Sequence, residues 1–148
     1  MKVIYEAEAS ATGGRGGGVR SSDGVLDLRL AVPKEMGGPG GAATNPEQLF
    51  AAGYAACFAS ALQSVARPKK MQLTASAVTA RVGIGRMEDG RFRLAVTLLA
   101  SLPDLARDDA DALVQEAHRI CPYSNATRGD ADVSVHLVGE DGAERAVA

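Results

Sequence analysis

The chain has 148 residues, a formal net charge of −2 and no tryptophan, and only 4% of its residues are aromatic. A chain of this length is predicted to form one domain spanning residues 1–148. The small charge gives no general attraction to nucleic acid or to anionic lipid, and the scarcity of aromatic residues argues against a base-stacking surface. The N-terminus has no basic segment followed by an apolar core, so we expect no signal peptide and a cytoplasmic protein.

The first third of the chain alternates apolar and polar residues between glycine-rich turns, which predicts an antiparallel three-stranded meander. The turn at residues 13–18 contains five glycines, and Arg15 is its only side chain.

Residues 33–43 are predicted to form a loop. Their glycine spacing resembles a dinucleotide-binding fingerprint, but Pro39 interrupts it and no acidic residue follows at the required distance. We therefore expect no nucleotide site.

The next stretch is predicted to be a helix that ends near Ala66. Asn45 suits the N-cap, Pro46 the first helical position and Gln48 the capping-box position. Residues 49–66 contain no charge, which is typical of a membrane span or of the buried centre of a fold. The run consists mostly of alanine and other small residues, which are weak for membrane insertion. The sequence therefore predicts a buried central helix with a thiol, Cys57, in its middle.

Beyond this helix the pattern predicts a hairpin, an amphipathic helix that ends before Pro122 and a last strand. Residues 123–129 are predicted to be loop, and the polar tail from 139 to have no regular structure. The order β-β-β-α-β-β-α-β, with meanders and hairpins, indicates an α+β fold with antiparallel sheets. The predicted strands span residues 3–10, 19–21, 25–32, 73–84, 91–99 and 133–138, and the predicted helices 46–66 and 104–120.

Two cysteines, Cys57 and Cys121, are the candidate nucleophiles. Two thiols in a reducing compartment are either inert core residues or one redox couple. A guanidinium near a thiol stabilises the reactive thiolate, and Arg15 is a candidate that Glu47 can hold by a bidentate pair. Taken singly, each of these residues is more often structural: a buried thiol, a turn residue, a charge in the first turn of a helix.

Other chemistry is weakly indicated. His118 and His136 join the two cysteines as soft metal ligands, but no C-x-x-C or H-x-x-x-H spacing supports a zinc site. The chain has no G-x-S-x-G motif, so a serine hydrolase is not indicated. We expect no metal.

Five segments together resemble a known family: residues 13–15, 21–24, 33–38, 44–58 and 121–129. Through them the chain is similar, from about Tyr5 to Leu137, to the organic hydroperoxide resistance proteins (Ohr), which are thiol-dependent peroxidases of the OsmC-like superfamily. The sequence of these segments is closer to the Ohr branch than to the osmotically induced OsmC branch.

The resemblance implies four functional residues. Cys57 matches the peroxidatic thiol and Cys121 the resolving thiol. Arg15 and Glu47 match the ion pair that tunes the peroxidatic thiolate. It also implies an intertwined homodimer with active sites at the interface, a preference for alkyl and lipid hydroperoxides, and reduction by dihydrolipoyl groups, free or on a lipoylated protein. The chain departs from the family pattern at Gly16 and Asp130, and Arg20 is a second arginine near the glycine turn.

Thiol chemistry then needs no metal, flavin or haem, because sulfur carries both electrons. We expect an apolar substrate pocket around Cys57 formed by Phe50, Tyr54 and Phe58. Helix geometry places Glu47 about 15 Å from Cys57 along the axis, which predicts a site shared between two subunits. The alternative function is a non-catalytic redox sensor or thiol-ligand binding module on the same fold.

Overall fold

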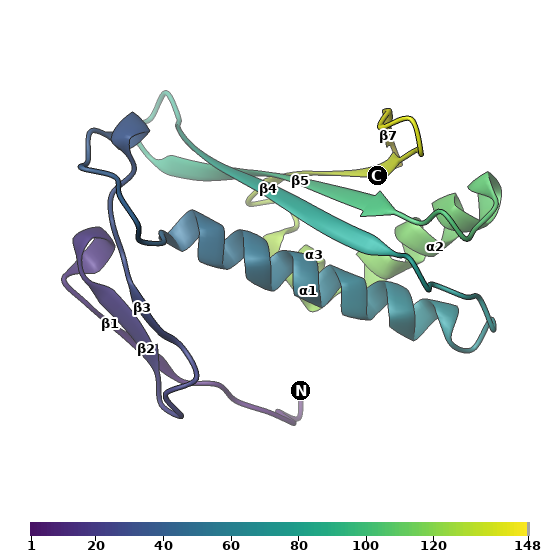
Figure 1. The fold of residues 1–148 in the computed structure, drawn as a ribbon, viewed down its shortest axis with the longest axis horizontal. Helices are drawn as coiled ribbons and strands as arrows, with labels where there is room; N and C mark the ends of the chain where they lie inside the picture. Colours follow the sequence, from purple (N-terminus) through teal and green to yellow (C-terminus); the bar gives the residue numbers. More distant parts are fainter. Residues whose placement is uncertain (148) are drawn as a thin grey trace. The chain divides into compact units, whose positions relative to one another are not determined.

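The computed structural model describes residues 1–147. The chain divides into two compact units, Met1–Leu49 and Phe50–Ala148. The first unit is built on a three-stranded sheet, and the second on a four-stranded sheet with helices (Figure 1). The predicted α+β class is confirmed, whereas the prediction of a single domain stays a prediction.

The first unit contains the predicted antiparallel meander, with β1 (Ala9–Thr12), β2 (Gly18–Ser21) and β3 (Asp27–Arg29) in that order across the sheet. The first strand starts later than predicted, because the ladder with β2 begins at Ala9 opposite Ser21, where β2 ends. The glycine turn forms a short 3-10 turn. Glycine is required in it at Gly17, where a Cβ atom would lie 1.8 Å from the Thr12 carbonyl oxygen.

The second unit has the strand order β4-β5-β6-β7. Strands β4 (Ala77–Arg86) and β5 (Phe92–Ser101) form the predicted hairpin. The next strand, β6 (Asp132–Val138), pairs with β5 in parallel, so this sheet is mixed, whereas the sequence predicted antiparallel sheets. A parallel pair needs a long crossover connection, which the helices between the two strands provide. The polar tail is also ordered, because β7 (Glu144–Ala146) pairs with β6.

Three α-helices are described in residues 1–147. The first, α1 (Pro46–Ala66), has the predicted bounds, and the Gln48 amide donates to the Asn45 side-chain oxygen at 2.8 Å, as expected of an N-cap. The Gln48 side chain accepts from the Thr44 hydroxyl at 2.9 Å instead of closing a capping box. Helix α2 (Arg107–Ile120) begins three residues later than predicted. Helix α3 (Pro122–Thr127) replaces the predicted loop, because the proline that ends α2 also suits a helix start.

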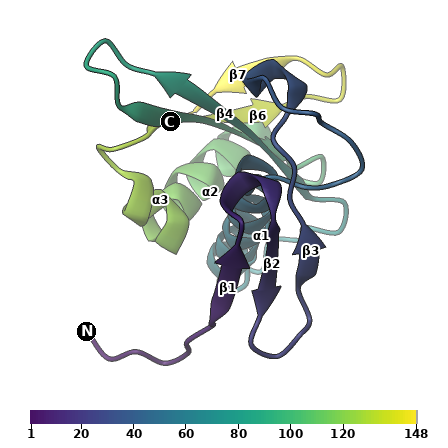
Figure 2. The same cartoon turned by 90° about the vertical axis from the view of Figure 1, so that its left-hand side faces the viewer.

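Helices α1 and α2 lie on the same face of the four-stranded sheet (Figures 1 and 2). One side of α1 is buried against β5, β6 and α2, through Tyr54, Phe58, Ala61, Leu62, Val65 and Ala66. The other side is exposed and is formed by small or polar residues, Ala52, Ala56, Ser60, Gln63 and Ser64. The predicted central helix is therefore present, but only one of its faces is covered within the chain.

By length and composition, α1 is the one helix in residues 1–147 that is apolar enough to cross a bilayer, and 33% of its most apolar window is buried. The core helix of a soluble protein satisfies the same criterion. Since one face of α1 forms the centre of the core of the second unit, this property by itself does not indicate a membrane span.

Candidate active site

The two cysteines lie against each other in the second unit. Cys57 is in the middle of α1 and half-buried, and Cys121 is fully buried at the junction of α2 and α3. Their Sγ atoms are 3.6 Å apart, and the Cys121 thiol donates to the Cys57 sulfur. A disulfide bond is about 2.0 Å long, so a small side-chain movement joins the two atoms. The pair can therefore act as a dithiol-disulfide couple.

The environment of Cys57 favours the neutral thiol. Burial raises the pKa of the Cys57 thiol, and the neighbouring Cys121 thiol raises it further, whereas the Tyr123 backbone N–H lowers it. The raising effect is the larger one. Because the thiolate is the nucleophile, a positive charge close to Cys57 would increase its reactivity.

Helix α3 is tied to α1 beside this thiol pair. The Tyr54 hydroxyl, one helical turn before Cys57, donates to the Ser124 Oγ at 3.0 Å, and it lies 3.3 Å from the Thr127 Oγ1. Ser124 is only 2% exposed. Since buried hydroxyls need partners, this bond fixes the position of α3 and with it the Tyr123 N–H that faces Cys57.

Aromatic side chains surround the Tyr54–Ser124 hydrogen bond, which anchors α3 to α1. The Tyr123 ring lies 6.0 Å from the Phe50 ring and 5.6 Å from the Tyr54 ring. It also covers Gly53, where a Cβ atom would lie 3.1 Å from the tyrosine oxygen. Tyr123 and the hydroxyls of Tyr54 and Ser124 were not predicted as part of the site, because residues 123–129 were expected to form a loop. The proline after α2 was the one local signal for a new helix there.

The expected substrate pocket differs from the structure. Tyr54 and Phe58 are 0% exposed and belong to the core, so they pack beneath Cys57 and present no accessible surface. Phe50 is partly buried and keeps some exposed surface. Sequence spacing on α1 does not distinguish a pocket wall from core packing, and the substrate pocket stays a prediction.

Arg15 and Glu47 form a bidentate ion pair in the first unit. The two guanidinium nitrogens donate to the two carboxylate oxygens at 2.8 and 2.7 Å. Arg15 lowers the pKa of the Glu47 carboxyl mainly through this hydrogen bonding. The stabilisation from a lowered carboxyl pKa is present above the unfolded pKa of glutamate and is lost as the pH falls through the lowered value. At neutral pH the arginine is therefore held in one orientation.

The second arginine near the turn is held much less firmly. Arg20 lies 3.8 Å from Asp27, and both side chains are 69% exposed. Of the two arginines, Arg15 is thus the one whose position is fixed by a close carboxylate.

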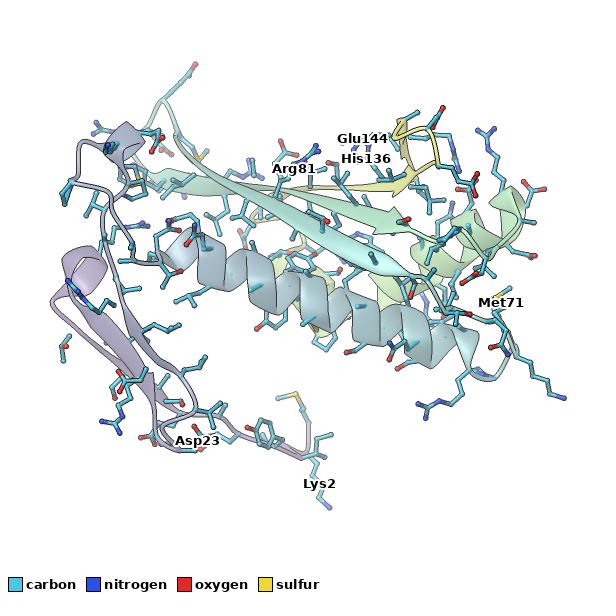
Figure 3. All side chains as sticks on the ribbon, in the orientation of Figure 1. Lys2, Asp23, Met71, Arg81, His136 and Glu144 are labelled. Atoms are coloured by element: carbon cyan, nitrogen blue, oxygen red, sulfur yellow. The ribbon has the colours of Figure 1, made fainter. Side chains whose placement is uncertain are left out.

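The other soft ligands do not assemble with the thiols. Residues 1–147 contain no group of three or more histidine, cysteine, aspartate or glutamate side chains placed to hold a metal ion. His136 lies on the face of the sheet opposite α1, together with the Arg81–Glu144 ion pair (Figure 3). His118 packs beside Phe58, at 6.5 Å between ring centres, and burial lowers its pKa.

The anchor on α3 can be tested directly. Tyr54→Phe removes the donor to Ser124 and is expected to lower the free energy of unfolding by about 1–3 kcal/mol. It should also raise the pKa of Cys57, because the Tyr123 N–H is held less firmly. The measurement is the pH dependence of thiol alkylation together with denaturant unfolding. Tyr5→Phe, at an exposed tyrosine, is the control. An unchanged alkylation profile in Tyr54→Phe would show that the bond has no effect on the thiol.

Comparison with known proteins places this chain in a family. Residues 38–136 match the model of the OsmC-like protein family. The organic hydroperoxide resistance protein of Xanthomonas axonopodis pv. citri is 50% identical over 92% of this chain and 96% of its own length. The corresponding protein OhrB of Bacillus subtilis is 46% identical over 91% of this chain and 98% of its own length.

Solved structures agree. The chain is similar to the crystal structure of a putative organic hydroperoxide resistance protein from Vibrio cholerae, with captopril in one of its active sites, at a TM-score of 0.89 and 50% identity over 98% of this chain and 97% of that one. It is also similar to the crystal structure of an organic hydroperoxide resistance protein OsmC from Legionella pneumophila, at a TM-score of 0.87 and 49% identity over 92% of this chain and 98% of that one. The chain therefore belongs to the organic hydroperoxide resistance proteins of the OsmC-like family.

Proposed function

We propose that this chain is a cysteine peroxidase that reduces organic hydroperoxides to alcohols. The observation that carries the proposal is the 3.6 Å separation of the Cys57 and Cys121 sulfurs, one half-buried and one buried. In the first step the Cys57 thiolate attacks the distal oxygen of R-O-O-H. The O–O bond breaks, the alkoxide takes up a proton and leaves as R-OH, and Cys57 becomes a sulfenic acid.

The second step uses the neighbouring thiol. Cys121 attacks the sulfenic sulfur, a disulfide forms, and the hydroxyl leaves as water. An external dithiol then reduces the disulfide by exchange, so that one dithiol is oxidised for each hydroperoxide reduced. We expect this donor to be a dihydrolipoyl group, free or on a lipoylated protein, in the cytoplasm. Sulfur carries both electrons, so the steps call for no cofactor.

In this scheme the Arg15 guanidinium, oriented by Glu47, supplies the positive charge. Glu47 and Cys57 are ten residues apart on the continuous helix α1, which corresponds to about 15 Å along its axis. In an intertwined homodimer the ion pair of one subunit serves the Cys57 of the other. The exposed small-residue face of α1 supports this arrangement, because it allows two such helices to approach closely.

Removing the second thiol tests the scheme. Cys121→Ser should still reduce one equivalent of organic hydroperoxide per chain, since Cys57 remains, but it cannot form the intramolecular disulfide. With excess hydroperoxide its Cys57 should proceed to sulfinic and sulfonic acid. Mass spectrometry of the intact protein and of its peptides measures both. A Cys121→Ser protein whose Cys57 stays unoxidised, or which turns over at the wild-type rate, would contradict the proposed role of Cys121.

A further inference from the structure

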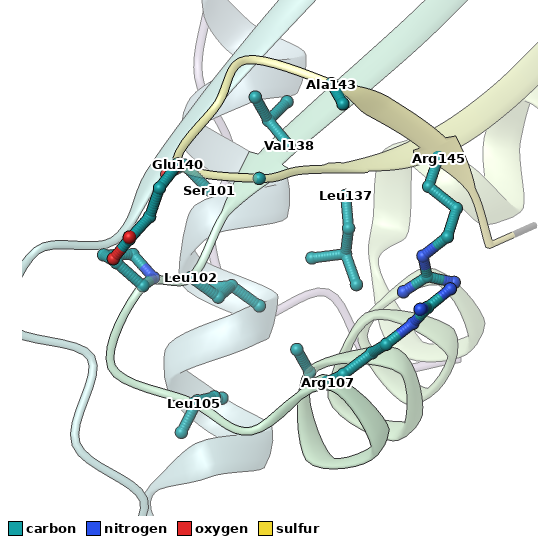
Figure 4. Close-up of a pocket in the computed structure, with 12 residues that line it drawn as sticks. Ser101, Leu102, Leu105, Arg107, Leu137, Val138, Glu140, Ala143 and Arg145 are labelled. Atoms are coloured by element: carbon teal, nitrogen blue, oxygen red, sulfur yellow. The ribbon is translucent and has the colours of Figure 1, made fainter.

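A cavity lies in the second unit, away from the thiols. Its volume is about 450 Å³, and it is lined by the end of β5, the start of α2 and the turn between β6 and β7 (Figure 4). This size falls in the range of pockets that bind small ligands, roughly 300–1,000 Å³. The apolar part of its lining is formed by Leu102, Leu105, Ala110, Leu137, Val138 and Ala143.

Two arginines lie at one end of this cavity. Arg107 and Arg145 both line it, and Figure 4 shows both side chains directed toward the same end. Arg145 forms an ion pair with Asp111. For Arg107, no ion pair is found within residues 1–147. The Arg145 guanidinium is thus paired with a carboxylate and, among the described residues, that of Arg107 is not, which leaves one unpaired positive charge at this end of the apolar surface.

The opposite side of the cavity carries the opposite charge. Glu140 lines it there, away from the two arginines (Figure 4). An anionic group is therefore repelled at one end and attracted at the other. This polarity fixes the direction in which an elongated anionic ligand lies.

The cavity is distinct from the thiol site because α2 separates them. Arg107 is the first residue of α2, and Cys121 follows its last residue. Fourteen residues of helix correspond to roughly 21 Å. A ligand in the cavity consequently does not contact the sulfur atoms.

We propose that this cavity binds a single-chain alkyl carboxylate, a fatty-acid-type ligand. The carboxylate accepts hydrogen bonds from the Arg107 guanidinium, in the fork geometry that arginine provides for carboxylates, with Arg145 beside it. The alkyl chain lies along the apolar lining. The site needs no redox step and is independent of the thiol chemistry proposed above.

The probe is decanoate below its micelle concentration, measured by isothermal titration calorimetry and by amide chemical shifts. We expect one site per chain, shifts centred on residues 101–110 and 137–145, and up to about fourfold tighter binding for each added methylene. Arg107→Gln should weaken decanoate binding about tenfold, because a charged hydrogen-bond donor is lost, and Arg107→Lys should restore only part of it. Arg119→Gln is the matched control, since Arg119 lies at the other end of α2 and pairs with Glu116.

Three results would overturn the proposal. Decanol binding as tightly as decanoate would show that the arginines do not recognise the headgroup. Inorganic phosphate competing with decanoate at equal concentration would show a simple anion site without use of the apolar lining. Equal affinities of Arg107→Gln and Arg119→Gln would show that decanoate binds elsewhere. Because all of these are binding measurements, they remain informative even if the protein has no peroxidase activity.

Discussion

Replacing Cys57 with serine is expected to abolish reduction of organic hydroperoxides, to the level of the reaction without protein. Serine keeps the size of the side chain, but its hydroxyl is not ionised at neutral pH and cannot form the sulfenic acid on which the cycle depends. The loss should be complete, because the only other thiol in the chain, Cys121, is buried. The measurement is alcohol formation from an alkyl hydroperoxide with a dithiol present.

The control for this variant is its stability. Cys57 lies on the central helix, so Cys57→Ser must be compared with the wild type by thermal or denaturant unfolding before its inactivity is interpreted. Ser60→Cys in the Cys57→Ser background is a further check, because it returns a thiol to an exposed position of α1 one helical turn after residue 57, and it should remain inactive. Multi-turnover activity in Cys57→Ser would remove Cys57 from the mechanism.

Replacing Arg15 with alanine is expected to slow oxidation of Cys57 by on the order of 100-fold, as is typical when one stabilising donor is lost from an active site. The physical reason is that burial raises the pKa of Cys57, so the thiolate depends on a nearby cation. The pH profile of thiol alkylation should shift to higher pH, because less thiolate is present at any given pH. Stopped-flow oxidation and alkylation rates measure the two effects separately.

Several variants sharpen this test. Arg15→Lys should recover part of the rate, since lysine keeps the charge but cannot form the two-nitrogen fork to Glu47. Arg20→Ala is the matched control, because Arg20 is exposed and only loosely paired. Mixing Glu47→Ala and Cys57→Ser subunits should restore activity if each site combines two chains, since a heterodimer then keeps one intact site. An unchanged alkylation profile in Arg15→Ala would show that another group activates the thiol.

Local signals in the sequence were sufficient for most of the elements. Asn45 and Pro46 marked the start of α1 and the charge-free run its extent, and the structure has the same bounds. The turn around Arg15 was predicted from its five glycines. The structure explains one of them, because only glycine tolerates the close approach at Gly17. In contrast, the parallel pairing of β5 and β6 was not predictable, since alternation identifies a strand and its faces but not its neighbour.

The candidate site was predictable to a similar degree. The residues named from the sequence form two close pairs, Cys57 with Cys121 and Arg15 with Glu47, although their catalytic roles stay predictions. The anchor between Tyr54 and Ser124 was missed, because a six-residue helix is too short for periodicity to reveal. Whether an aromatic residue near a thiol is core or pocket depends on tertiary packing, which is why the core positions of Tyr54 and Phe58 were not predicted.

The most direct test of the proposed peroxidase activity is turnover by the wild-type protein with excess dihydrolipoamide, comparing an alkyl hydroperoxide with hydrogen peroxide in parallel. We expect many equivalents of alkyl hydroperoxide to be consumed per chain, with one alcohol formed for each dithiol oxidised, and a markedly lower rate with hydrogen peroxide. Consumption of a single equivalent, after which the reaction stops while dithiol remains, would contradict the proposal and would identify the chain as a redox sensor.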